Sequence, residues 1–341
     1  MTSRTKLVTL SAVFVILLAT YIVGSVVTSR AGRSPVAGEP VVSEDVISDA
    51  QTIRLSAGGA EPQSTVLRRS GDAWEVEINE GLYPADSNRV EGFLDAMRTL
   101  RKVRIAADGA EYHEEFDVAG DAARVAAFLG EDDGELARIK FGKAETGGGR
   151  MYARHADEDR VFVVDRDVGF YFGQNTPYWS DLAPLPGDLT PQAIVRISVD
   201  ADLQIDEERR VTDRFTILRE AGQQGGGTWR IDASGGNEAE ELDQQAADDY
   251  ASNLTELEAA GFVTAEQVDT GLEDPSATLT FEDEAGGRYL VEVGDTAGES
   301  RFYMRVTGDD VDAAESGRPF LYTVSAYQLG RILKNRDALM P

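Results

Sequence analysis

The residues with the clearest chemical potential are the two histidines, because each lies beside several carboxylates. His113 stands between Glu111 and Glu114, and His155 is followed by the acidic run 157–159. Imidazole and carboxylate groups together can bind a transition metal. Neither histidine has a second histidine four residues away, as the H-E-x-x-H zinc motif requires. We therefore interpret both as surface histidines in charged turns and assign no metal ligand.

Four short acidic clusters recur along the chain, and calcium prefers such oxygen ligands. They are Glu131–Glu135, Asp157–Asp159, Glu282–Glu284 and Asp309–Asp312. None has the D-x-[DN]-x-[DN]-G loop with a distal Glu that defines a calcium-binding loop. Most fall where we expect hairpin turns, so we interpret them as solvated turn residues.

Other reactive groups are equally sparse. The 341 residues include no Cys, which excludes disulfides and thiolate nucleophiles. The glycine runs 147–149 and 225–227 lack the Lys-Ser/Thr of a phosphate-binding loop, and no G-x-S-x-G elbow occurs. We predict no catalytic, cofactor-binding or metal-binding residue, no cofactor, no nucleotide ligand and no enzymatic activity.

The charge balance is strongly acidic, with a net charge of −28. Such a chain repels phosphate, so we predict no nucleic-acid partner. Of its 33 basic residues, 28 are Arg and five are Lys. An acidic surface of this kind is typical of salt adaptation, since salt screens self-repulsion, although a GC-rich genome also replaces Lys with Arg.

One apolar segment, Leu7–Val27, is long enough to cross a membrane. Its twenty-one residues carry no formal charge, and a helix of that length spans about 31 Å, close to the ~30 Å hydrocarbon core. A cleaved signal peptide, the alternative, has a shorter apolar core and a small-residue cleavage site. We predict an uncleaved anchor within residues 1–30, and a Gly-, Pro- and Ser-containing linker at 31–46.

The body contains two series of similar segments in the same order. The matched pairs are Ile53–Ser56 with Val195–Ser198, Thr65–Arg68 with Thr216–Arg219, Trp74–Val76 with Trp229–Ile231, Phe93–Leu100 with Tyr250–Leu257, Ile139–Gly142 with Val291–Gly294, Met151–Arg154 with Phe302–Arg305, and Val161–Val164 with Phe320–Thr323. Self-similarity at a nearly constant offset indicates duplication. We predict two modules, residues 47–187 and 188–341.

Each module combines short alternating segments with one helical stretch. The first helix is predicted around Val90–Leu100, whose apolar residues share one face, and the second over 240–259. We expect strands at Thr52–Ser56, Thr65–Arg69, Ala73–Ile78, Ala122–Leu129, Leu136–Gly142, Met151–His155, Arg160–Phe172, Ala277–Glu282, Tyr289–Gly294, Arg301–Val306 and Phe320–Val324, and a closing helix at Ala326–Lys334. The predicted fold class is α+β: an N-terminal transmembrane helix, then two duplicated modules of antiparallel β-meanders, each with one main amphipathic helix.

Three stretches of the second module resemble a known family, the domain of unknown function 4340. They are Asp274–Phe281, Val293–Arg305 and Leu333–Leu339. The first module departs from this pattern at Asp117–Gly120 and Trp179–Leu182. The resemblance implies a bacterial, membrane-anchored protein, often encoded beside ABC-type transporters, including gliding-motility systems. It implies no catalytic residue.

These observations predict a function in binding. We expect a single-pass protein of the cytoplasmic (inner) membrane, held by Leu7–Val27 with its body on the extracytoplasmic side. The expected role is an accessory or scaffold protein, with an ABC-type permease complex as the membrane-protein partner. The alternative is an extracytoplasmic ligand-binding protein or hydrolase that uses an acidic cleft.

Overall fold

The structure is a computed structural model. It describes residues 36–59, 63–79, 81–221, 227–232, 241–264, 268–309, 311–312 and 319–341. The predicted anchor, Leu7–Val27, lies outside these residues. None of the helices within them combines the length and apolar character that a membrane span needs.

The first antiparallel sheet contains nine strands in the described part of the chain. The strands are β1 (Thr52–Ser56), β2 (Ser64–Ser70), β3 (Ala73–Ile78), β4 (Gly81–Pro84), β5 (Lys102–Asp108), β6 (Arg124–Leu129), β7 (Glu135–Ala144), β8 (Met151–His155) and β9 (Arg160–Val164). They are arranged β4-β3-β2-β1-β6-β7-β8-β9-β5. The accompanying helices are α2 (Glu44–Asp49), α3 (Ser87–Thr99), α4 (Thr176–Trp179) and three short 3-10 turns, η1 (Ala110–Tyr112), η2 (Gly120–Ala122) and η3 (Gly169–Gly173).

The second antiparallel sheet has eight strands among the described residues. The strands are β10 (Ile194–Gln204), β11 (Arg210–Ala221), β12 (Gly227–Ile231), β13 (Gly261–Phe262), β14 (Ala277–Asp283), β15 (Arg288–Thr296), β16 (Arg301–Gly308) and β17 (Leu321–Ser325). They are arranged β12-β11-β10-β14-β15-β16-β17-β13. The helices are α5 (Gln244–Thr255), α6 (Ala326–Ile332) and the 3-10 turn η5 (Arg336–Leu339). Antiparallel sheets with few helices confirm the α+β class.

The two sheets share one strand order. If β4 is set aside, β3-β2-β1-β6-β7-β8-β9-β5 corresponds strand by strand to β12-β11-β10-β14-β15-β16-β17-β13. The two matched tryptophans, Trp74 and Trp229, lie on corresponding strands, β3 and β12, and both are buried. Tyr152 and Tyr303 likewise lie on β8 and β16. The segments that recur in the sequence therefore lie on strands that occupy corresponding positions in the two sheets.

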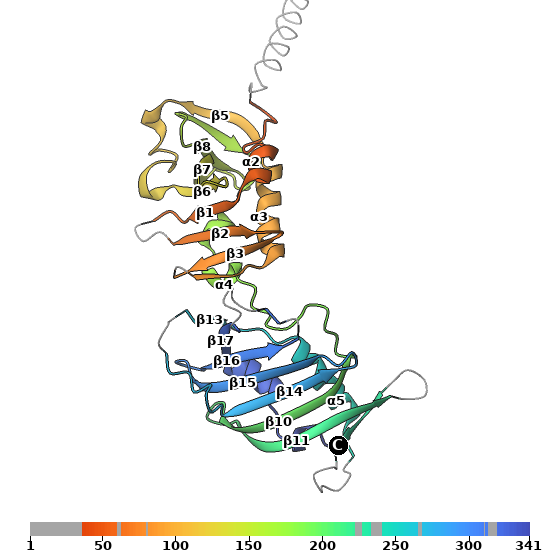
Figure 1. Ribbon diagram of the computed structural model, residues 1–341. Helices are drawn as coiled ribbons and strands as arrows, with labels where there is room; N and C mark the ends of the chain where they lie inside the picture. The colour runs from red at the N-terminus through yellow and green to blue at the C-terminus, as the bar shows by residue number, and fades with distance from the viewer. Residues whose placement is uncertain are drawn as a thin grey trace, which may run out of the picture. The chain divides into compact units, whose positions relative to one another are not determined.

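One amphipathic helix lies against each sheet (Figure 1). The face of α3 predicted from its spacing is buried, and the Phe93 ring stacks 6.3 Å from that of Phe128 on β6. The corresponding helix, α5, buries Tyr250, whose hydroxyl donates to the Ile332 carbonyl at 2.7 Å. Asp243 begins α5 by accepting bonds from two free first-turn amides, which shortens the predicted 240–259 helix. Helix α6 ends at Ile332, two residues before its predicted end.

The chain forms two compact units. Unit 1 holds the chain up to Asp72 together with Asn88–Asn175, and unit 2 holds Ala73–Ser87 together with Thr176–Pro341. The hairpin β3–β4 groups with unit 2. Tyr83 on β4 packs against other rings of that unit: its ring centroid lies 4.6 Å from that of Phe262 and 5.7 Å from that of Phe320. This division does not coincide with the predicted boundary at 187/188.

Some elements differ from the sequence expectations. Residues 36–46, assigned to a linker, contain buried Val41 and Val42 and the start of α2. The strand predicted over Arg160–Phe172 stops at Val164. The side chain of Asp167 accepts the Gly169 amide at 2.7 Å, which closes a turn and leads into the 3-10 turn η3 instead. Strands β4 and β5 were not predicted.

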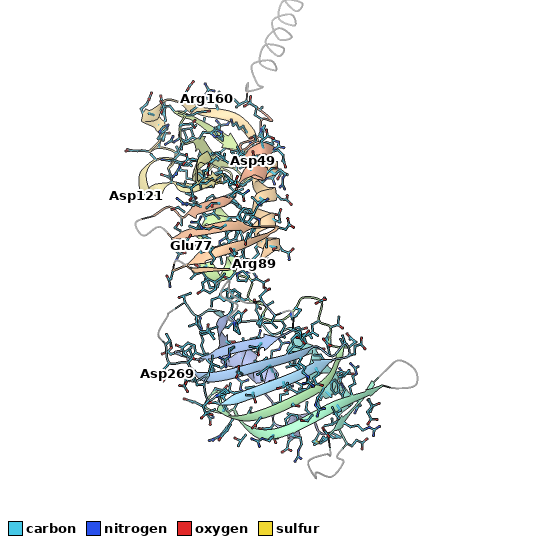
Figure 2. All side chains as sticks on the ribbon, in the orientation of Figure 1. Asp49, Glu77, Arg89, Asp121, Arg160 and Asp269 are labelled. Carbon is cyan, nitrogen blue, oxygen red and sulfur yellow. The ribbon has the colours of Figure 1, made fainter. Side chains whose placement is uncertain are left out.

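Charged side chains project from the surface of the described chain (Figure 2). Asp49, Asp121 and Asp269, for example, are all exposed. The buried positions are overwhelmingly apolar, with Thr52, Thr65, His113, Arg154 and Ser180 as the polar or charged residues buried among those described. The acidic excess is therefore carried by solvated positions, where its repulsion is screened most readily.

Candidate functional site

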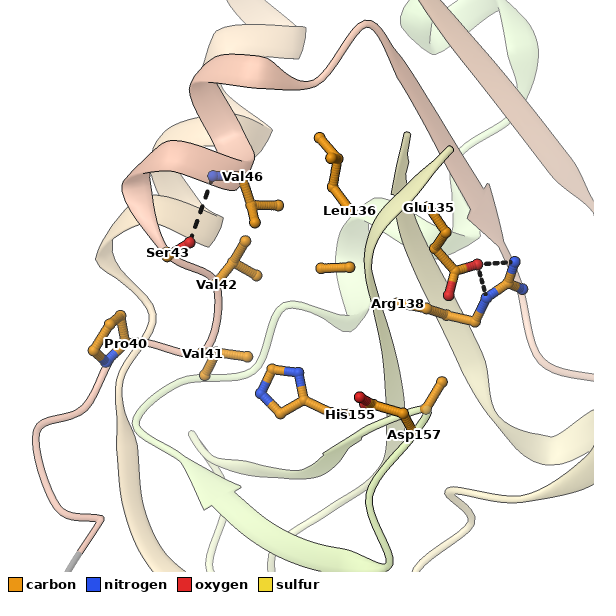
Figure 3. A pocket seen from close by; sticks show the side chains of 12 residues that line it. Pro40, Val41, Val42, Ser43, Val46, Glu135, Leu136, Arg138, His155 and Asp157 are labelled. Atoms are coloured by element: carbon orange, nitrogen blue, oxygen red, sulfur yellow. Dashed lines mark hydrogen bonds and ion pairs between the residues drawn. The ribbon is translucent and has the colours of Figure 1, made fainter. Parts of the chain in front are cut away.

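A cavity in unit 1 is the best candidate for a binding site (Figure 3). Its volume is about 420 Å³, within the ~300–1,000 Å³ range of small-ligand sites. One wall is the segment Pro40–Val46, and the other comes from the start of β7 and the end of β8. The lining residues are Pro40, Val41, Val42, Ser43, Val46, Glu135, Leu136, Ala137, Arg138, His155, Ala156 and Asp157.

The first wall is fixed by backbone contacts and by a helix cap. The Val41 amide donates to the Leu100 carbonyl at 3.2 Å, and Pro40 forms a β-bridge with Arg101. The Ser43 hydroxyl accepts the Val46 amide at 3.5 Å and begins α2. With these contacts Val41 and Val42 are buried and Val46 is partly exposed, so the side chains of this wall are largely apolar.

The second wall mixes apolar and charged groups. Leu136 is 40% exposed and is one of the few large apolar side chains that are exposed among the described residues. Glu135 and Arg138 form an ion pair at 2.6 Å, so their charges compensate each other. The Ala156 amide donates to the Arg138 carbonyl at 2.8 Å, which joins β7 to the turn after β8. The Asp157 carboxylate is exposed and forms no ion pair with another described residue.

His155 is the titratable ring of this cavity. Burial lowers the pKa of His155, and the nearby Lys102 ammonium lowers it further, while Glu158 and Asp157 oppose both effects. The imidazole is therefore neutral at neutral pH and has one donor and one acceptor nitrogen. In Figure 3 the ring stands between Val41 and Asp157. The cavity can thus offer apolar contact, a neutral hydrogen-bonding ring and a carboxylate.

His113 occupies a different environment from His155. It is 8% exposed, which differs from the predicted surface position. Its Nε2 lies 2.8 Å from the Asp159 carbonyl oxygen, and because a carbonyl only accepts, this nitrogen carries the hydrogen. The short 3-10 turn η1 folds the ring inward. No group of three His, Asp or Glu side chains among the described residues is placed to hold a metal ion.

A polar arrangement recurs at corresponding places in both units. Phe141 pairs with Ala153 and Val293 pairs with Met304, so Arg154 and Arg305, the next residues, correspond. Arg154 donates to the Val118 carbonyl at 3.0 Å, and Arg305 donates to the Leu272 carbonyl at 3.2 Å.

Both arginines therefore hold the main chain of a loop. Arg154 also donates to the carbonyls of His155, Ala156 and Glu158, whereas Arg305 pairs with the Glu292 carboxylate at 2.7 Å. Hydrogen bonding to Glu292 raises the pKa of Arg305, and burial lowers that of Arg154. The first-unit arginine is satisfied by main-chain oxygens.

Residues of the predicted acidic clusters contact groups in their own turns and arginines on neighbouring strands. The Asp283 carboxylate accepts the Ala285 and Gly287 amides at 2.9 and 2.8 Å. Asp133 lies 3.8 Å from Arg54 and from Arg68. Of the 309–312 cluster, Asp310 lies outside the described residues.

A larger cavity, about 570 Å³, lies in unit 2 and is lined by three aspartates. Asp202 pairs with Arg210 at 2.7 Å, and Asp269 accepts the Gly271 amide at 3.3 Å. Asp295 completes the trio. Two of the three carboxylates are therefore engaged with neighbouring protein groups. A smaller cavity of about 250 Å³ is lined by residues 181–187 and Asp312.

Residues 74–275, more than half of the chain, match the model of a family described as Domain of unknown function (DUF4340). The chain belongs to this family. The match begins in β3 and ends just before β14, so it crosses from one sheet to the other and does not itself mark out two copies. No curated protein and no solved structure matches the chain. Family membership confirms the resemblance and assigns no activity.

The DUF4340 match also leaves out the first wall of the cavity, since residues 40–46 precede it. Sequence reasoning missed these residues because the longer stretch 31–46 contains prolines, glycines and acidic side chains, as linkers do. The available signal was the pair Val41–Val42 followed by Ser43, a capping residue, and two acidic residues.

Proposed function

We propose that this protein is a membrane-anchored, extracytoplasmic accessory protein that acts by binding. The observation that carries the proposal is the repeated sheet order, with an arginine that holds a loop carbonyl at the same place in each unit. The shared polar groups serve the scaffold, while the loops they hold differ between units. This pattern favours two related binding platforms, and we infer that they arose by duplication.

The anchor part of the proposal rests on Leu7–Val27. A permanent anchor confines the body to a thin layer beside the membrane and raises its effective concentration near membrane partners. Protease added to spheroplasts is expected to digest the body, and the matched control replaces the anchor with a cleavable signal peptide, which releases the body. Full protection in intact, right-side-out membranes would refute the orientation.

The proposed partner is a membrane complex of the ABC-transporter type, which would supply the energy through its own ATPase. This part rests on the family resemblance and on the scarcity of chemistry-bearing residues in the sequence. The test is co-purification from gently solubilised membranes, using a tagged full-length chain. Co-elution of a permease and its ATPase is expected. Recovery of the protein alone, while the transporter assembles fully without it, would remove the proposal.

A further inference from the structure

We propose that the cavity between Pro40–Val46 and the β7–β8 wall docks an extended segment of a partner protein in which an apolar side chain stands beside a Lys or Arg. This inference rests on the binding role proposed above and names the chemistry of the partner. The lining residues provide two features that a partner must complement, an apolar slot and an uncompensated negative charge.

The apolar requirement comes from the two facing walls. Val42 and Val46 face Leu136 across the opening in Figure 3, and Val41 lies beside His155. Leu136 is 40% exposed and Val46 is partly exposed, whereas Val41 and Val42 are already buried. A side chain inserted here would therefore remove apolar surface of Leu136 and Val46 from water. A volume of about 420 Å³ suits one or two aliphatic side chains with their backbone.

The charge requirement comes from the rim. Glu135 and Arg138 neutralise each other, which leaves Asp157 as the unpaired charge of the lining among the described residues. His155 is kept neutral by burial and by Lys102, so it adds no positive charge and can hydrogen-bond a peptide group. The chain as a whole carries −28, which also draws a basic segment. An anionic lipid headgroup would be repelled.

The position of the cavity along the chain restricts where the partner can be. Twelve residues lie between Val27, the end of the proposed anchor, and Pro40. A fully extended chain covers at most ~3.6 Å per residue, so the cavity lies within about 45 Å of the membrane surface. The fitting partner is therefore an extracytoplasmic loop or tail of a membrane protein.

The test uses the full-length protein in detergent micelles and two labelled peptides, Gly-Ser-Leu-Arg-Leu-Ser-Gly and its Leu-Glu-Leu counterpart. Fluorescence anisotropy measures affinity. The basic peptide is expected to bind at least tenfold more tightly than the acidic one. Leu136→Ser is expected to weaken it by about fivefold to tenfold, since part of a leucine's burial is lost, and Asp157→Asn by about threefold.

Two matched controls and one local probe make the outcome specific. Leu82→Ser removes a leucine of similar exposure in unit 2, and Asp72→Asn removes an exposed aspartate in another turn; both are expected to leave affinity unchanged. Because the chain has two histidines, ring-labelled His155 gives a resolved NMR signal that should shift on binding. Circular dichroism checks that each variant folds.

Three results would overturn the inference: equal binding of both peptides, unchanged affinity in Leu136→Ser, or a His155 signal that does not move. Absence of peptide binding at millimolar concentration would also overturn it. None of these outcomes affects the co-purification experiment, so a failed docking site and a failed accessory role are distinguishable. Reduced recovery of the transporter with Leu136→Ser, but not with Leu82→Ser, would place the same site in the complex.

Discussion

Replacing Gly142 or Gly294 with alanine is expected to destabilise the unit that contains it. Both glycines lie where a loop crosses close to a strand: β7 in unit 1 and β15 in unit 2. A Cβ at position 142 would overlap the Phe116 carbonyl oxygen and lie 2.9 Å from Val118 Cγ1. At position 294 it would overlap the Thr270 carbonyl oxygen.

The expected size follows from these contacts. Each carbonyl oxygen would have to move away by about 1 Å, because Cβ atoms in proteins essentially never lie closer than 3.0 Å to such an atom. Overpacking of this kind costs about 1–3 kcal/mol. Moving the Phe116 oxygen also strains the hydrogen bond that it accepts from the Lys143 amide, and moving the Thr270 oxygen strains the one that it accepts from the Asp295 amide. A hydrogen bond of this kind contributes about 0.5–1.5 kcal/mol to stability. The smaller entropy loss of alanine on folding returns about 0.4–1 kcal/mol.

The net loss of about 1–4 kcal/mol corresponds to a fall of about 5–10 °C in the unfolding midpoint at mid-range. Thermal unfolding followed by circular dichroism measures it. The controls are Gly134→Ala in unit 1 and Gly187→Ala in unit 2, where an added Cβ meets nothing within 4 Å. These two variants are expected to leave the unfolding midpoint unchanged or to raise it slightly. An unchanged midpoint in Gly142→Ala and Gly294→Ala, or an equal fall in the controls, would refute the reasoning.

Three further predictions concern single groups and the whole surface. Tyr250→Phe leaves the buried Ile332 carbonyl without its 2.7 Å bond, so urea denaturation should show a loss of about 1–3 kcal/mol; a change below the measurement error would contradict this. The pKa of His155 is lowered in the folded protein, so the free energy of unfolding should fall as the pH drops from about 6.5 through the lower folded pKa. His155→Gln should flatten this pH dependence. An NMR titration midpoint of His155 above 6.5 would show that the direction of the pKa shift is wrong. The melting midpoint should rise from low salt to about 1 M salt, where the Debye length is ~3 Å, and no rise would count against salt adaptation.

Local patterning predicted much of the strand content. The bounds of β1, β3 and β8 match the predicted strands, because clear turn residues stand beside each of these β-rich segments. β5 escaped prediction because none of its residues is fully buried and two bulges interrupt its pairing with β9. Its position depends on β9, which is more than fifty residues away in the chain.

The register of the repeat was only partly predictable. Ile139–Gly142 and Val291–Gly294 do correspond, since Ile139 pairs with Ala126 and Val291 with Leu279 on the neighbouring corresponding strands. The match of Ile53–Ser56 to Val195–Ser198 is two residues out. In the sheets it is Ile53 and Ile197 that pair with Phe128 and Phe281. A slip of two keeps each side chain on the same face, so alternation alone cannot detect it.

The candidate site was not predictable in the same way. His155 was singled out as a possible ligand, but the sequence could not show that residues 40–46 fold back to face it. His155 is more than a hundred residues from this segment in the chain. The segment is held by a backbone bond from Val41 to Leu100 and a bridge from Pro40 to Arg101, which are also distant in the sequence. Chemistry-bearing residues are visible in a sequence, whereas the apolar wall that turns them into a cavity is set by tertiary structure.

The two arginine-held loops have a consequence for protein engineering. Arg154 and Arg305 donate hydrogen bonds to main-chain carbonyl oxygens, which every amino acid has. These bonds therefore constrain the loop sequence at few positions. The segments Phe116–Val118 and Thr270–Leu272 have no residue in common, yet the last residue of each is apolar and buried. The second residue of each segment, Asp117 or Gly271, has a positive φ and must be kept. Randomising the first position, while also keeping the apolar residue, the arginine and the crossing glycine, would give a display library on a loop that is held through its main-chain oxygens.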